Sequence, residues 1–372
     1  MRPLITAPHA TPSAAGAREP SLPAATRAGG GAAHELGETD LALIEALQLQ
    51  PRAPWSRIAA VIGIDATTAA RRWRRLTASG TAWMTAYPTH HATIVGYVDL
   101  ACDADAVEAV TTRTRLWGPV FSVERTSGEH QVFLSVAARD LAALDDLVTR
   151  RLGTLPGVRT LRLSICTEVH GEGSGWLVHS LSERQRSDLA GASRHRAPRP
   201  PAVPNASDRR LLQALGADAR YSHSELAREC ELSPTTVRRR LQRMTGRGEI
   251  YFRCDLTQQL AGWPVVATYR LCVPGPGVDT VARALAAMAE TRVCSTVTGS
   301  ANLLLSVWLR TPADCAALED RILHRHPGLG VRERSITLHT SKRMGRLLDA
   351  TGRAQRHVAM TAAPEGLEDA GG

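Results

Sequence analysis

The spacing of apolar residues predicts three short helices near the start of each half of the chain. The first helix is marked by apolar positions at helical spacing, which are Leu43, Ile44 and Leu47 in one half and Leu211, Leu212 and Leu215 in the other. A second helix is expected over 55–63 and over 222–231. The third begins at Asp65-Ala66 or at Ser233-Pro234, because Asp and Ser are favoured N-caps and Pro is favoured at the first helical position.

After each trio of helices the pattern alternates between strands and helices. Strands are expected at 94–101 and 265–273, at 119–126 and 292–298, at 131–137 and 302–309, and at 158–167 and 331–339. Helices are expected at 104–116 and 279–290, and at 140–152 and 313–325. The order βαββαβ predicts a ferredoxin-like sandwich, and its open sheet face needs a partner.

The two halves repeat each other. Residues 40–80 align with 208–248 without a gap, and 14 of these 41 positions are identical. Farther along, GEHQVFLSV from Gly128 matches GSANLLLSV from Gly299. We conclude that a whole module has been duplicated.

The outward face of each third helix carries arginines and no acid. The faces expected to be buried are formed by Ala69, Trp73 and Leu76 and by Val237, Leu241 and Met244. Residues 66–79 include four arginines and residues 234–247 include five, without an acidic residue in either range. Such a face suits insertion into the major groove of DNA. The residues expected to contact DNA are Thr67, Thr68, Arg71, Arg72, Arg74, Arg75, Thr235, Thr236, Arg239, Arg240, Gln242 and Arg243.

These patterns predict an α+β protein in which a winged-type helix-turn-helix DNA-binding domain and a ferredoxin-like sensor domain occur twice. The expected boundaries are a disordered leader at 1–34, helix-turn-helix domains at 35–83 and 207–253, sensor domains at 84–181 and 254–345, a linker at 182–206 and a largely disordered tail at 346–372. The leader, the linker and the tail contain too few periodic apolar residues to form a core.

Composition favours a polyanionic partner and a cytoplasmic location. The net charge is +9 with a pI near 9.7, and all basic residues except Lys342 are arginine. The seven cysteines are scattered without a C-x-x-C pair, as expected of core residues in a reducing compartment. Because no apolar run approaches 18 residues, we expect no membrane insertion.

The helix-turn-helix, the βαββαβ order and the G-x-x-x-apolar run that opens the third strand resemble the Lrp/AsnC family of bacterial transcription regulators, here in tandem form. The resemblance covers 36–180 and 207–345. It implies binding of double-stranded DNA, RAM-type sensor domains, and an amino acid or related small effector bound between subunits. The loop residues implied to bind that effector are Gly128, Glu129, His130, Gln131, Gly299, Ser300, Ala301 and Asn302. Of the acidic residues usual in this loop, the first copy keeps only Glu129.

A chain with two modules could pair them internally as a pseudo-dimer, and further homo-oligomers are expected because the family commonly assembles. Two other functions stay open. Siroheme decarboxylases of heme biosynthesis are similar to the same family, and His130, His90 and His91 would then be the catalytic candidates. A chromosome-organising protein would bind DNA without an effector. No nucleophile elbow, P-loop, dinucleotide motif or metal-ligand cluster is present, so we expect no enzyme, cofactor or metal.

Overall fold

Each half of the chain begins with the expected trio of helices. The computed structural model describes residues 36–89, 93–190 and 205–361. The first trio is α1 (Glu38–Leu49), α2 (Trp55–Ile62) and α3 (Ala66–Ala78), and the second is α7 (Ala206–Ala217), α8 (His223–Glu229) and α9 (Pro234–Gly246). Asp65 caps α3 and Ser233 caps α9, and each side chain accepts a hydrogen bond from a backbone amide three residues on. The predicted buried faces of α3 and α9 are confirmed.

Each trio is followed by a strand and then by the expected βαββαβ order. The first module contains β1 (Ala82–Pro88), β2 (Ile94–Cys102), α4 (Val107–Thr114), β3 (Val120–Thr126), β4 (Val132–Ala138), α5 (Leu141–Asp145, continued by a π-helical segment, Asp146–Leu152) and β5 (Val158–Gly171). The second contains β6 (Ile250–Leu256), β7 (Val265–Cys272), α10 (Val278–Ala286), β8 (Thr291–Val297), β9 (Leu303–Leu309), α11 (Asp314–Arg325) and β10 (Gly330–Arg343). Short 3-10 helices span Gln258–Ala261 and Gly275–Gly277.

The strand after each trio pairs with its counterpart from the other module. β1 and β6 form a two-stranded antiparallel sheet in which Ala82 faces Leu256 and Pro88 faces Ile250. A wing is a β-hairpin within one DNA-binding domain, whereas β1 and β6 come from different modules. The expectation of winged domains is therefore corrected. Because α7 packs on β1 and α1 packs on β6, both trios share one hydrophobic core.

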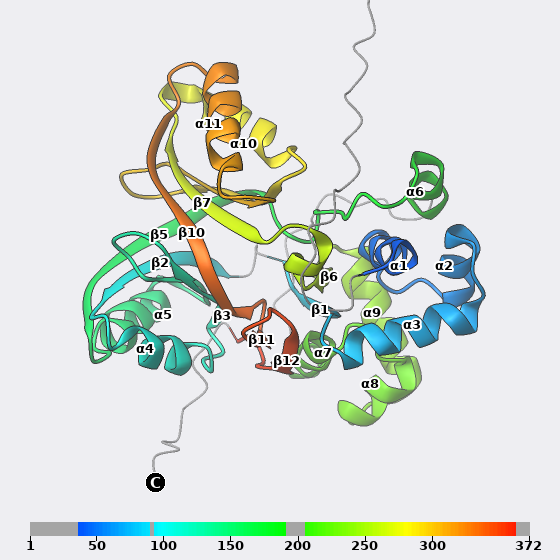
Figure 1. Cartoon of the computed structure of the whole chain (residues 1–372). Coiled ribbons are helices and arrows are strands. Elements are labelled where there is room, and N and C mark those ends of the chain that lie inside the picture. Colours follow the sequence, from blue (N-terminus) through cyan, green and yellow to red (C-terminus); the bar gives the residue numbers. More distant parts are fainter. Residues whose placement is uncertain (1–35, 90–92, 191–204, 362–372) are drawn as a thin grey trace, which may run out of the picture. The chain divides into compact units, whose positions relative to one another are not determined.

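The two sensor modules are joined by their last strands (Figure 1). β5 pairs with β2 of its own module and then, from Cys166, with β8 of the other. β10 pairs in the same way with β7 and then with β3. The ring β10-β3-β4-β2-β5-β8-β9-β7 therefore closes on itself. This is how each open sheet face acquires its partner within the chain.

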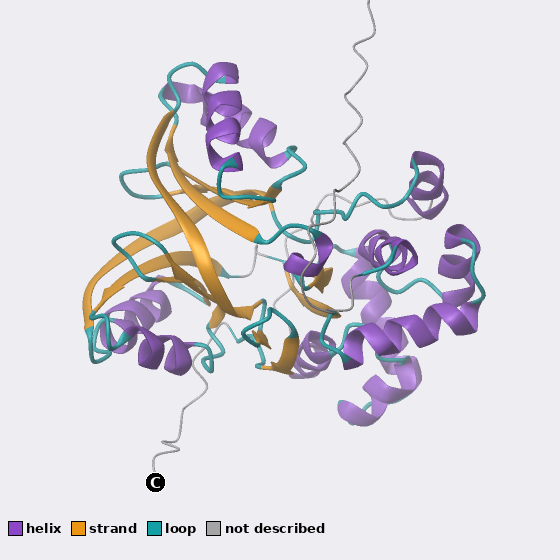
Figure 2. Ribbon diagram, viewed as in Figure 1, coloured by secondary structure: helices purple, strands orange, loops and turns teal. Residues whose placement is uncertain are grey.

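Helices lie outside this ring, as Figure 2 shows. Separate cores lie between α4, α5 and the first sheet and between α10, α11 and the second. A third, smaller core inside the ring includes Tyr97, Phe133 and Leu304. Within the described residues, no helix is long and apolar enough to cross a membrane.

Two expected boundaries differ from the structure. Residues 183–190, expected in the linker, form α6 (Glu183–Ala190), which packs on α1 and α2 and buries Leu189. Residues expected in the tail form β11 (Arg346–Leu348) and β12 (Ala354–His357), which extend the sheet beyond β10. The predicted leader, residues 191–204 of the linker, residues 362–372 of the tail, and His90 and His91 lie outside the described residues.

Candidate functional site

The outward faces of α3 and α9 keep part of the expected DNA-binding set exposed. Thr67, Arg71 and Arg74 on α3, and Thr235, Arg239 and Gln242 on α9, are exposed. Thr68 and Thr236 are half-buried in the first turn of their helices, where their amides bond to the caps. Exposure together with the absence of acids leaves this surface able to approach a polyanion.

The remaining predicted arginines hold the helices in place. Arg72 and Arg75 contact Asp40 of α1 at 3.0 and 2.9 Å. The equivalent pairs in the second trio join Arg240 and Arg243 to Asp208 of α7 at 2.8 and 2.7 Å. Burial alone would raise the pKa of Asp208, but the hydrogen bonds from Arg243 and Arg240 lower it. Sequence reasoning placed these arginines only on DNA and missed their intramolecular partner.

A reciprocal contact joins the two trios. Arg52 donates to the carbonyl oxygens of Ala219 and Tyr221, and Arg220 donates to those of Pro51 and Ala53. The two arginines occupy the same position of the repeat, which is a mark of two-fold pairing. Their identity in the aligned repeat was the one sequence signal for this contact.

The predicted effector loops lie at the seam between the modules. Ser127 exchanges hydrogen bonds with the backbone of Ile336, and Thr298 does so with Ile165, so that each loop is tied to the crossing strand of the other module. The side chains of Gln131 and Asn302 bond to the backbone at the ends of β2 and β7. Glu129 and Ser300 are exposed, and Ala301 is buried. None of these predicted loop residues lines either cavity described below.

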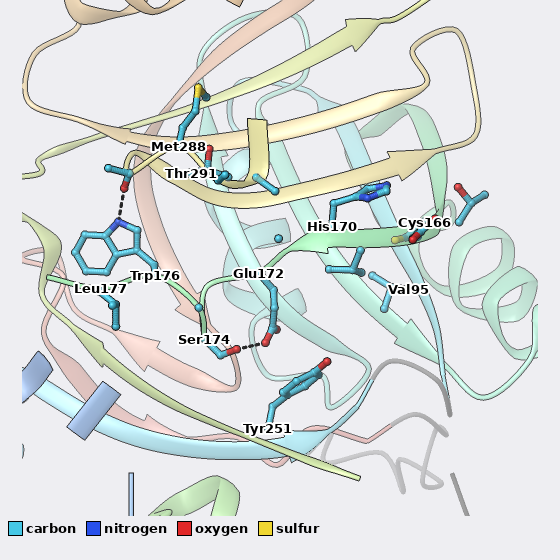
Figure 3. A pocket seen from close by; sticks show the side chains of 18 of the residues that line it. Val95, Cys166, His170, Glu172, Ser174, Trp176, Leu177, Tyr251, Met288 and Thr291 are labelled. Atoms are coloured by element: carbon cyan, nitrogen blue, oxygen red, sulfur yellow. Dashed lines mark hydrogen bonds between the residues drawn. The ribbon is translucent and has the colours of Figure 1, made fainter. Parts of the chain in front are cut away.

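A cavity of about 780 Å³ opens beside β5 (Figure 3). One wall is the end of β5 and the segment after it, from Cys166 to Leu177, and the other is the turn from α10 into β8, from Ala286 to Thr291. Trp176 donates to the carbonyl of Ala289 at 2.9 Å and so joins the two walls. Its ring centre lies 4.8 Å from that of Trp308 on β9.

A smaller chamber of about 90 Å³ lies inside the ring and shares Val95, Val169 and Glu172 with the outer cavity. Its guanidinium groups are those of Arg253, Arg292 and Arg343, and its aromatic walls are Tyr97, Phe121, Phe133 and Trp308. The arginines come from β6, β8 and β10, and all three are buried or nearly so. Sequence reasoning missed this chamber, because an arginine within a strand pattern is normally taken for a solvent-facing residue.

Acidic side chains accompany these arginines, because Glu124 and Glu172 also line the chamber. Asp255 pairs with Arg253 at 2.6 Å and with Arg292 at 3.0 Å. Burial would raise the pKa of Asp255, but the three arginines hold it below its ordinary value. Burial, and next the neighbouring Arg253, lower the pKa of Arg292. Arg292 also lies 3.9 Å from the ring centre of Trp308 and 4.7 Å from that of Trp176.

At the edge of the outer cavity, the ligand atoms of Glu168, His170 and Asp279 lie within 4.8 Å of one another. Asp279 is already paired with Arg283. We assign no metal to this group.

The sequence matches two family models. The model of the AsnC-type helix-turn-helix domain matches residues 36–77 and again 205–245, and that of the Lrp/AsnC ligand binding domain matches 96–175. An HTH-type transcriptional regulator of Pyrococcus abyssi is 31% identical over 136 residues, which is 36% of this chain and 84% of the relative. One of Pyrococcus furiosus is 32% identical over 105 residues, 28% of this chain and 71% of the relative.

The two-module fold is also that of an enzyme. The crystal structure of the siroheme decarboxylase NirDL matches 83% of this chain and 93% of its own, with a TM-score of 0.53 and 13% identity. The expectation that the chain is not an enzyme is therefore corrected, because this architecture supports catalysis as well as DNA binding. At that identity the likeness shows the fold alone, whereas the matches to the domain models and to the Pyrococcus regulators establish the family. The chain belongs to the Lrp/AsnC family of HTH-type transcriptional regulators.

Proposed function

We propose that the chain is a sequence-specific DNA-binding regulator that reads an operator with α3 and α9 as an internal pair. The observation that carries this proposal is that the arginines of each helix fall into two groups, one paired with an aspartate and one exposed to solvent. Arg72 and Arg75, like their counterparts on α9, pair with a buried aspartate, whereas Arg71 and Arg239 are exposed and make no ion pair with any described residue. A rigidly seated helix with free guanidinium groups is what base reading requires.

The two reading heads should prefer different half-sites. Arg74 and Gln242 occupy equivalent exposed positions, and Arg favours guanine whereas Gln favours adenine. Ala70 is likewise replaced by Arg238. Because Arg52 and Arg220 tie the trios together, one chain would present both heads at a fixed spacing. We propose an operator of two unlike half-sites separated by about one helical turn or a multiple of it.

The experiment is selection of DNA from a random pool by the purified chain, followed by fluorescence anisotropy on the selected site. The double variant Arg71→Ala/Arg239→Ala should lose about 1–3 kcal/mol per contact and relax preference at one base of each half-site. Arg228→Ala, on an exposed position of α8, is the control and should bind like the parent. Equal affinity of the double variant and the parent would refute the assignment.

We also propose that a small effector, an amino acid or a related molecule, acts between the two sensor sheets. The loops at Gly128–Gln131 and Gly299–Asn302 remain candidates for binding it. The hydrogen bonds of the adjacent residues to Ile336 and Ile165 would transmit a conformational change in one module to the other. Further self-association of the chain is proposed as well. Leu338 on β10, 69% exposed, is a candidate contact for it.

A second candidate function is catalytic. The fold shared with NirDL and the arginine-lined chamber favour an enzyme that acts on a carboxylate-bearing molecule, as siroheme decarboxylase does by its name. His170 and His179 line the outer cavity and His130 does not, so the former pair would be the candidates for proton transfer. Tetrapyrrole absorbance in the purified protein and release of CO₂ from added siroheme would support this function. If neither is observed and the chain binds its operator, the catalytic function is rejected and the regulatory function remains.

A further inference from the structure

The strand registers relate the two sensor modules residue by residue and reveal a reversal of charge. In the first module Asp99 on β2 lies opposite Arg162 on β5, and in the second module Arg270 on β7 lies opposite Glu333 on β10. Both residues of the second pair lie 171 positions after those of the first, so Asp99 is equivalent to Arg270 and Arg162 to Glu333. At both positions the two modules therefore carry opposite charges.

These four side chains meet across the seam between the modules. Arg270 donates to the carboxylate of Asp99, and both residues are buried. Arg162 lies 2.7 Å from Glu333 and 3.0 Å from Asp99. Residues that are equivalent in the two halves of a two-fold pair contact each other only near its axis. We call these four residues the axial quartet: Asp99, Arg162, Arg270 and Glu333.

The charges of the axial quartet alternate in sign. Each carboxylate lies beside the arginine of its own module by register and beside the arginine of the other module through an ion pair. Burial would lower the pKa of Arg162, but Asp99 and Glu333 hold it above its ordinary value. Burial lowers the pKa of Arg270, and the same two carboxylates oppose that effect. Every charge in the quartet is thus stabilised by two neighbours of opposite sign.

A pair of like modules would lose this alternation. Two first modules would bring Asp99 against a second Asp99, and Arg162 against a second Arg162. Two second modules would do the same with Arg270 and Glu333. Like charges in contact at a poorly solvated seam repel strongly, because little water is available to screen them. The seam of each module therefore fits the other module and disfavours a copy of itself.

A third pair of equivalent positions differs in the same sense. Glu172 directly follows β5 and Arg343 ends β10, again at an offset of 171 positions. Both residues line the inner chamber. Two first modules would place two glutamates there, and two second modules would place two arginines. The reversal of charge thus extends from the axis into the chamber.

We propose that the axial quartet determines which modules pair, so that each sensor module accepts the unlike module and rejects a copy of itself. The partner that either seam fits carries the opposite charge at both axial positions. Pairs of two first modules, or of two second modules, from different chains are thereby excluded. This keeps α3 and α9 in one unlike pair. The proposal concerns the pairing of modules and holds whether the chain binds DNA or acts as an enzyme.

Exchanges of charge within the full chain test this proposal without a change in net charge. The double variant Arg270→Asp/Glu333→Arg gives the second module the axial charges of the first. The converse double variant, Asp99→Arg/Arg162→Glu, gives the first module those of the second. Each double variant therefore imitates a pair of like modules. The quadruple variant, with all four substitutions, restores the alternation with its signs reversed.

Thermal denaturation compares these variants with the parent. We expect each double variant to melt about 5 °C or more below the parent, and the quadruple variant to regain about half or more of the larger loss. The control Asp146→Arg/Arg150→Asp exchanges an exposed ion pair after α5 and should melt within about 2 °C of the parent. A double variant as stable as the parent, or a quadruple variant no more stable than the double variants, would overturn the proposal. If the double variants do not fold, folding of the quadruple variant supports the proposal and its failure to fold rejects it.

The dependence on pH separates repulsion between charges from a loss of packing. In Arg270→Asp/Glu333→Arg, the carboxylate introduced at position 270 faces Asp99, and each raises the pKa of the other. The stability of this variant falls as pH rises through the raised pKa, so its melting temperature should lie closer to that of the parent at pH 5 than at pH 8. An equal difference at both pH values would assign the loss to packing and reject the axial quartet as the determinant of pairing.

Discussion

Arg52 and Arg220 occupy one position of the repeat, and each bonds to the backbone of the other's helix-turn-helix. Arg220 bonds to Pro51 and Ala53 at 2.8 and 3.1 Å and lies 3.8 Å from the ring centre of Trp55. Burial lowers its pKa to about 10, so it remains charged at neutral pH. This pair links the two trios of helices, in addition to the β1–β6 sheet and the shared core.

Arg220→Met should therefore loosen that link. Loss of two charge-assisted hydrogen bonds should lower the free energy of unfolding by about 1–3 kcal/mol. Affinity for an operator with both half-sites should fall, while affinity for a single half-site stays the same. Chemical denaturation and anisotropy on the two DNA fragments check this, with Arg228→Met as the exposed control. A uniform loss on both fragments would mean that Arg220 does not set the pairing.

Asp208 makes the second helix-turn-helix sensitive to acid. Its pKa is lowered in the folded chain by Arg243 and Arg240, against the effect of burial. The stability it contributes is thus present above the unfolded value of about 3.9 and is lost as pH falls through the folded pKa. Asp208→Asn should be less stable than the parent at pH 7 by about 1–2 kcal/mol. The difference should shrink below pH 4 in urea denaturation, and a difference that persists there would exclude the charge as its cause.

Glu231 adopts a conformation that glycine would adopt more readily. Its φ is +55°, whereas Gly63, its counterpart in the repeat, has φ +76° and ends α2. The ion pair of Glu231 with Arg210 is exposed and worth little. We predict that Glu231→Gly raises stability by about 0.5–1 kcal/mol, and that Gly63→Ala lowers it by a similar amount. Thermal denaturation measures both, and a lower melting temperature for Glu231→Gly would contradict the prediction.

Lys342 should reduce stability at neutral pH. Burial lowers its pKa to about 7, whereas the unfolded lysine titrates near 10.4. The unfolded chain therefore binds more protons between these values, and stability contributed at this site rises with pH from about 7 to 10. Lys342→Met should remove that rise and stabilise the chain at pH 7 by about 1–4 kcal/mol. Denaturation at pH 7 and pH 9.5 tests this, and an unchanged pH dependence would show that Lys342 is not responsible.

Local sequence patterns predicted α3 and α9 well. Helical spacing identified the buried side of α9, and Ser233 with Pro234 identified its start, because both signals depend on residues within a few turns. Sequence could not reveal that Arg243 turns to Asp208. That choice depends on how α7 lies against α9.

For the ring of sensor strands, the sequence predicted the positions of the strands but not their arrangement. Period-two patterns located the strands, but they do not tell which strand pairs with which, so the crossing of β5 and β10 was not foreseen. The arginine in TRVCSTV gave no sign that Arg292 lies against both Trp176 and Trp308. The helix α6 was not predicted because its sequence is mostly polar and Leu189 is its one buried apolar residue among those described.

The central claim is that one chain reads two unlike half-sites with its own pair of helices. Footprinting on a selected operator, combined with light scattering of the complex, tests it most directly. We predict an asymmetric footprint protected by a single chain, in which Arg71→Ala weakens protection of one half and Arg239→Ala that of the other. A palindromic footprint that requires two chains, or no sequence preference at all, would contradict the account.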